Sequence, residues 1–197
     1  MMHRDDEASK LGMWLFLFTE ILLFGGLFLV YAIYRYMNQA DFQSGSEHLD
    51  LFFGTLNTVI LIISSFTVAA SITATQKNRL KTATWLLIIT IILAVFFLVN
   101  KYIEWGHKFE LGLFPKGEHF SELARGEQMF FLLYYFMTGL HALHVIIGAV
   151  FIGFIISKLI KKRITNDNYV LQENAGLYWH LVDLIWIFLF PLLYLIT

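Results

Sequence analysis

The sequence of 197 residues contains no cysteine, which excludes disulfide bonds, thiolate metal sites and thiol catalysis. Proline is scarce, with two residues, and this suits long helices better than a strand-rich barrel. Only 15% of the residues are charged, whereas a soluble domain has about a quarter. Lys and Arg total 14 against 15 Asp and Glu, so no basic surplus exists and nucleic acid is excluded as a partner.

Apolar residues dominate instead, because 58% of the chain is hydrophobic and 17% is aromatic. A helix rises about 1.5 Å per residue, so roughly 20 apolar residues cross a bilayer. The apolar runs lack the alternation of an outer-membrane barrel. The sequence therefore predicts an all-α, polytopic membrane bundle with five transmembrane helices in a single domain, 1–197. The predicted spans are 11–34, 52–75, 83–104, 128–157 and 176–196.

Loop charges predict the orientation of these spans. With a cytoplasmic N-terminus, the inner segments carry nine basic residues: Arg4, Lys10, Lys77, Arg79, Lys81, Lys158, Lys161, Lys162 and Arg163. The outer segments then carry five: Arg35, Lys101, Lys108, Lys116 and Arg125. Because basic residues are retained on the cytoplasmic side, we expect the N-terminus inside and the C-terminus outside.

The stretch TGLHALHVIIGAV places His141 and His144 one helical turn apart near the middle of the fourth span. Glu20 lies in the first span at a similar depth, roughly 14 Å from its start. Ionisable groups at this depth are costly and turn toward partners inside the bundle. We therefore expect a buried polar cluster of Glu20, His141 and His144, with Glu20 hydrogen-bonded to one imidazole as a neutral pair. A network that only ties helices together explains the same residues equally well.

Further polar residues lie within or beside the spans. The sequence YWHLVDLIW places His180 and Asp183 on one helical face, as a second polar pair. Candidates for contacts with lipid or between helices are Asn57, Glu104, Glu173 and Trp179. The small residues of FGGLF and GAVFIGF allow close approach of helix backbones.

Two kinds of metal site are alternatives to these polar clusters: a haem held by two histidines and a ferritin-like carboxylate–histidine site. A haem held by two histidines needs ligands that face each other from separate helices, which His141 and His144 on one helix do not provide, although His144 with His180 remains possible. A ferritin-like site uses carboxylates from four helices with Glu-x-x-His motifs, whereas this chain has fewer carboxylates and a different motif order. We expect no metal ligands in this chain.

Long segments of the sequence resemble subunit III of the haem–copper respiratory oxidases, in its shorter five-helix bacterial form. The resemblance is carried by YYFMTGLHALHVIIG and YWHLVDLIWIFLF, which match the family's two signature helices, and by LFLFTEILLFGGLFLVYAIYR, LNTVILIISSFTVAAS and KYIEW. It covers all five spans in order. The family's membrane-embedded carboxylate falls on Glu20. Larger members have seven helices, and this chain lacks the first two.

The resemblance implies a subunit of an oxidoreductase complex that is not itself catalytic. It implies no cofactor in this chain, with haem and copper in partner subunits, and bound phospholipid between the helices. The implied partners are oxidase subunit I by direct contact, subunit II and other respiratory-complex subunits, and membrane lipids. The implied location is the bacterial inner membrane, and the implied role is to stabilise subunit I and support proton uptake during oxygen reduction to water.

Two other functions remain open from the sequence. One is the related small subunit of a nitric-oxide reductase system. The other is a stand-alone proton or ion transporter, because a carboxylate in mid-membrane is typical of proton relays. The absence of an internal repeat makes a transporter less favoured.

Overall fold

The computed structural model describes residues 6–115, 117 and 119–196, so Arg4 and Lys116, which were counted for the orientation, lie outside the described residues. The described residues form α-helices and one short 3-10 helix, Phe120–Glu122, and no sheet. The α-helices are α1 (Asp6–Met37), α2 (Gln39–Glu47), α3 (Leu51–Gln76), α4 (Leu80–Glu110), α5 (Arg125–Ile160) and α6 (Val170–Tyr194). The fold is all-helical, as predicted.

Five of these helices, α1 and α3 to α6, are long and apolar enough to cross a membrane, which confirms the predicted number of spans. Each begins before the predicted start, and four of them also end beyond the predicted end. The extension is largest in α4, which continues to Glu110 and ends before Gly112, whose φ of 68° glycine adopts without strain. The helix α2 was not predicted, because its sequence QADFQSGSE carries no apolar run.

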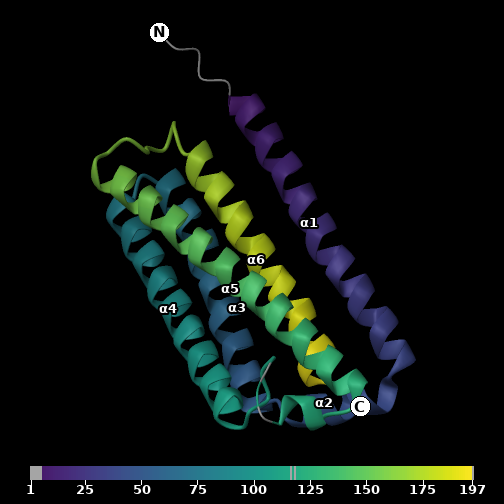
Figure 1. The fold of residues 1–197 in the computed structure, drawn as a ribbon. Coiled ribbons are helices and arrows are strands. Elements are labelled where there is room, and N and C mark those ends of the chain that lie inside the picture. The colour runs from purple at the N-terminus through teal and green to yellow at the C-terminus, as the bar shows by residue number, and fades with distance from the viewer. Residues whose placement is uncertain (1–5, 116, 118, 197) are drawn as a thin grey trace.

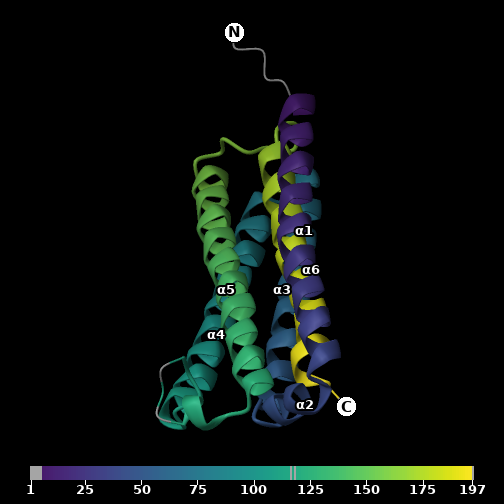
Figure 2. The same cartoon turned by 45° about the vertical axis from the view of Figure 1, so that its right-hand side comes forward.

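Figures 1 and 2 show the five long helices side by side, with α2 lying across one end of the bundle. Helix α6 contacts α1, α3 and α5, and α4 packs against α3 and α5. In an apolar stretch of 18 residues from each helix, 50% of the α6 residues are buried inside the chain, against 17% of the α1 residues. Helix α6 is therefore the central helix, and α1 lies at the edge of the bundle.

Helix α1 attaches to the bundle along a narrow seam. Its buried residues are Leu17, Phe24 and Tyr31, which recur every seven residues and so form a single stripe. The Tyr31 hydroxyl donates a hydrogen bond to the carbonyl oxygen of Leu192 in α6. The remaining face of α1 is apolar and exposed, and it is available to lipid or to another membrane protein.

The segments FGGLF of α1 and GAVFIGF of α5 differ in how closely another helix approaches their glycines. A Cβ atom added at Gly148 would lie 2.8 Å from the Trp179 ring, so α5 and α6 approach closely at this point. The same atom at Gly25 or Gly26 would have no heavy atom within 4 Å. The close approach that these small residues allow therefore occurs within this chain at Gly148 and not at the two glycines of α1.

Candidate functional site

Glu20 of α1 and His144 of α5 form a polar contact between two of the five long apolar helices. The Glu20 Oε2 and His144 Nε2 atoms are 2.9 Å apart, and both side chains are largely buried, with 14% and 10% of their surface exposed. The other ring nitrogen, Nδ1, lies 2.8 Å from the carbonyl oxygen of Leu140. Since a carbonyl oxygen only accepts, Nδ1 carries the hydrogen and Nε2 is directed at the carboxyl group.

Aromatic side chains enclose this pair. The Phe24 ring meets the His144 ring edge to face, with 5.2 Å between the ring centroids. The Tyr178 hydroxyl donates to the His144 backbone carbonyl at 3.3 Å. The Glu20–His144 contact therefore joins α1 to α5 in apolar surroundings, which strengthen a hydrogen bond and make the loss of either partner costly.

His141 lies in a different interface from His144. Its fully buried ring packs against Phe97 of α4 and Trp186 of α6, with centroid distances of 5.5 Å and 5.1 Å. Neither ring nitrogen has a hydrogen-bond partner among the described residues. A step of three residues turns a helix by about 300°, so two such side chains point about 60° apart. On α5, this angle directs His144 toward α1 and His141 toward the α4–α6 interface.

The predicted polar pair of His180 and Asp183 is not joined by a hydrogen bond in the structure. His180 Nδ1 lies 2.6 Å from the hydroxyl of Ser65 in α3, with which it forms a hydrogen bond. Asp183 is 3% exposed, and neither carboxyl oxygen has a hydrogen-bond partner within the described chain. His180 therefore bonds to α3, and no hydrogen bond joins it to Asp183.

The four remaining candidates all lie between helices or at their ends. The Asn57 side-chain oxygen accepts a hydrogen bond from Asn100 at 3.0 Å, which links α3 to α4. The Trp179 indole donates to the Ser64 hydroxyl at 3.0 Å, which links α6 to α3. Glu173 forms a partly exposed ion pair with Lys10 of α1 at 3.1 Å. Glu104 belongs to a larger cluster, which the sequence analysis missed.

This cluster has Glu104 at its centre. The carboxylate accepts hydrogen bonds from Lys101 (2.9 Å), Lys108 (3.3 Å), Tyr134 (2.8 Å) and Tyr194 (2.6 Å). Lys101 also donates to both tyrosine hydroxyl oxygens. All five residues are buried, and they connect α4, α5 and α6 near one end of the bundle. The spacing K-x-x-E-x-x-x-K, which places three charges on one face of a helix, is the signal that could have revealed it.

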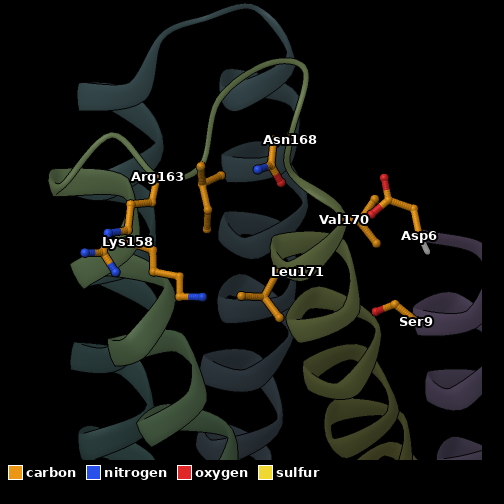
Figure 3. A pocket seen from close by; sticks show the side chains of 8 residues that line it. Asp6, Ser9, Lys158, Arg163, Asn168, Val170 and Leu171 are labelled. Atoms are coloured by element: carbon orange, nitrogen blue, oxygen red, sulfur yellow. The ribbon is translucent and has the colours of Figure 1, made fainter. Parts of the chain in front are cut away.

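A pocket of about 280 Å³ lies at the opposite end of the bundle, between α1, α5 and α6. Figure 3 shows Lys158 and Arg163 on one side of it, and Asp6 and Ser9 of α1 on the other. The Lys158 side chain extends toward Leu171 at the start of α6 (Figure 3). The pocket therefore combines two basic groups, one carboxylate and apolar wall residues at one end of the bundle.

Within the described residues, no group of three or more His, Asp or Glu side chains is arranged to hold a metal ion. Glu20 bonds to His144, whereas His141 and His180 have no hydrogen-bonded acid or imidazole partner among these residues. The fold and these contacts define a polytopic helical membrane protein whose buried polar residues join neighbouring helices.

Comparison with known proteins specifies this class further. Residues 5–197 match the family model described as cytochrome c oxidase subunit III, and the chain belongs to this family. It is 33% identical to cytochrome c oxidase subunit 3 of Thermostichus vulcanus, over 99% of this chain and 90% of that protein. It is 29% identical to the probable quinol oxidase subunit 3 of Staphylococcus saprophyticus, over 98% of this chain and 90% of that protein.

One relative combines two subunits in one chain. The heme-copper oxidase subunit I+III of Aeropyrum pernix is 29% identical over 96% of this chain and 23% of that longer protein. Membership of the family implies that the chain associates with other oxidase subunits in a membrane. The resemblance recognised from the sequence is thereby confirmed.

Proposed function

We propose that this chain is an accessory, non-redox subunit of a proton-pumping haem–copper terminal oxidase in a bacterial inner membrane. Haem and copper belong to partner subunits, and this chain stabilises subunit I, binds phospholipid and supports proton uptake. Membership of the subunit III family carries the proposal. The A. pernix chain that joins subunits I and III supports direct contact with subunit I, because the two parts of one chain remain close together.

The Glu20–His144 pair supports a role in handling protons. Nδ1 of His144 donates to a backbone carbonyl, so a neutral pair has its shared proton on Glu20, which donates it to Nε2. At mid-membrane depth, desolvation penalises a separated charge, which favours the neutral arrangement. The pair thus holds one proton between two groups at the edge of the bundle, where α1 meets α5.

The pocket in Figure 3 supports phospholipid binding. Lys158 and Arg163 supply charge for a phosphate group, and Ile164, Val170 and Leu171 supply apolar walls. The exposed apolar face of α1 continues from this pocket along the bundle, and an acyl chain can lie against it. The lipid would then fill space between the edge helix α1 and its neighbours.

Purification of the intact complex in mild detergent tests the function. Haem-bearing partner subunits are expected to co-elute with the tagged chain, and the chain separated from them is expected to show no Soret band and no stoichiometric metal. Glu20→Gln keeps the size and hydrogen-bonding capacity of the side chain, so the complex is expected to assemble and consume oxygen. Glu20→Ala leaves the His144 ring nitrogen unpaired and is expected to weaken the attachment of α1 by about 1–3 kcal/mol.

Two outcomes would contradict the proposal. If the chain elutes alone and carries protons or ions across vesicle membranes, it is a transporter. If Glu20→Gln abolishes oxygen consumption in a fully assembled complex, Glu20 lies on an obligatory proton path and the subunit is not accessory. Co-elution with a nitric-oxide-reducing partner would assign the chain to that related system instead.

We also propose that the N-terminus is cytoplasmic and the C-terminus lies outside, from the asymmetry of nine inner to five outer basic residues in the whole chain. A cysteine introduced near Gly117, at the exposed position of His119, is expected to react with a membrane-impermeant thiol reagent added from outside. A cysteine introduced at Lys161 is expected to remain unmodified until the membrane is opened. The chain has no native cysteine, so each variant carries a single label site. The reverse pattern would show that the orientation is wrong.

A further inference from the structure

A second cavity lies on a different side of the bundle, between the beginning of α4 and the end of α5. Its volume is about 300 Å³, and its walls are Leu80, Lys81, Thr84, Trp85, Leu159, Ile160 and Lys162. It shares no residue with the pocket in Figure 3, which is lined by α1, the end of α5, the loop after it and the start of α6. We call this cavity the α4–α5 groove.

The walls of the α4–α5 groove have two kinds of surface. Leucine, isoleucine and tryptophan side chains make up most of the lining, and the Thr84 hydroxyl is already bonded to the Leu80 carbonyl within its own helix. Among the described residues, the charged groups that line it are two ammonium groups, Lys81 from α4 and Lys162 from the end of α5. No acidic residue lines the groove, and neither lysine forms an ion pair within the described part of the chain. The groove is thus amphipathic and cationic.

Lys162, which lines the groove, has the backbone conformation of a helix end. Lys162 has a φ of 52°, the left-handed conformation that ends many helices, and its N–H donates to the Leu159 carbonyl at 3.0 Å. Lys81 lies in the first turn of α4, on the other side of the groove. Two cations from different elements are therefore placed around one apolar cavity at the same end of the bundle.

The surface next to the groove is apolar. Trp85 is 67% exposed, and Ile89 and Ile92 follow it on α4 with 41% and 49% exposed. An exposed tryptophan above exposed isoleucines is typical of the boundary between headgroups and hydrocarbon. An amphiphile in this position has its charged group at the lysines and its apolar part along α4.

We propose that the α4–α5 groove binds one anionic phospholipid, with its phosphate between Lys81 and Lys162 and an acyl chain against Trp85 and Ile160. Charge complementarity selects an anionic headgroup, because the groove offers two cations and no carboxylate. In the proposed orientation the groove lies in the cytoplasmic leaflet. The site is separate from the lipid pocket beside α1, so either site can be present without the other.

The test measures lipid retained by the purified intact complex. The complex is incorporated into nanodiscs of phosphatidylcholine that contain a minor fraction of phosphatidylglycerol, and bound lipid is counted by native mass spectrometry. The double variant Lys81→Gln/Lys162→Gln is compared with Lys77→Gln/Lys161→Gln, which removes the same charge from nearby exposed positions outside the groove. We expect the groove variant to lower the affinity for phosphatidylglycerol on the order of tenfold at one site, and the control variant to keep it.

A photoreactive residue in place of Trp85 identifies what occupies the groove. Cross-linking to phosphatidylglycerol, lost in the Lys81→Gln/Lys162→Gln background, supports the proposal. An equal loss of phosphatidylglycerol in the two double variants, or equal retention of phosphatidylcholine at the site in the parent complex, overturns it. A cross-link to another subunit in place of lipid also overturns it and assigns the groove to a protein interface. Variants of Lys158 and Arg163 change only the pocket beside α1, so failure here leaves the proposed function intact.

Discussion

Glu104→Ala is expected to destabilise the chain by about 3–5 kcal/mol, because it leaves the buried ammonium groups of Lys101 and Lys108 without their shared counter-charge. The hydroxyls of Tyr134 and Tyr194 lose their acceptor in the same change. Three helices meet at this carboxylate, so the loss is expected to loosen the whole end of the bundle. Unfolding of the purified subunit in micelles, followed by circular dichroism during titration with a denaturing detergent, measures the effect.

Glu110→Ala is the matched control for this prediction. Glu110 lies on the same helix, is exposed and forms no ion pair among the described residues, so its removal is expected to change stability by less than about 0.5 kcal/mol. Replacing all three charges, as Lys101→Met/Glu104→Leu/Lys108→Met, is expected to recover part of the stability, since no uncompensated charge then remains buried. Equal stability of Glu104→Ala and Glu110→Ala would mean that the cluster contributes nothing to the fold.

Gly148→Leu is expected to separate α5 from α6 and to destabilise the bundle by about 1–3 kcal/mol or more. Even the first carbon of the new side chain would lie 2.8 Å and 2.9 Å from two atoms of the Trp179 ring and 3.2 Å from Tyr178. A shift of Trp179 is costly, because the side chain is fully buried and its indole donates to Ser64. A reduced yield of the assembled complex and a lower midpoint of thermal unfolding are the measurable results.

Gly153→Leu provides the comparison on the same helix. A Cβ atom at Gly153 meets no heavy atom within 4 Å, so the leucine is expected to fit and to leave the unfolding midpoint close to that of the parent. The difference between the two variants isolates the helix contact, since the substitution and the helix are the same. If both variants unfold at the parent's temperature, the close approach of α5 to Trp179 does not limit the packing.

The pairing of Glu20 shows how far sequence reasoning reached into the site. Depth along the spans placed Glu20 level with the histidines of the fourth span, and the structure contains the Glu20–His144 hydrogen bond. The depth of a residue follows from its position along its own helix. It does not show how that helix is rotated about its axis, and so it does not show which neighbouring helix the residue faces. Which imidazole faces α1 depends on how α5 is turned, so His141 and His144 were interchangeable in the sequence and lie in different interfaces in the structure.

The cluster around Glu104 shows a second reason for incomplete prediction. Hydropathy placed Lys101 and Glu104 at the end of a span, where charged residues normally face water or headgroups. The helix continues to Glu110, and Tyr134 and Tyr194 arrive from two other helices to complete the hydrogen bonds. The partners are 30 and 90 residues away along the chain, so no local pattern joins them to Glu104.

The sequence by itself determined that the protein is a membrane bundle of five long helices and that it resembles oxidase subunit III, because span length, low charge and long motifs are properties of continuous segments. Only the tertiary structure decided which helix lies at the centre, which polar groups meet, and where the cavities lie. These features depend on the rotation and the neighbours of each helix. In a bilayer they follow from close contacts such as Gly148 against Trp179 and from buried hydrogen bonds, since hydrophobicity alone does not distinguish one apolar face from another.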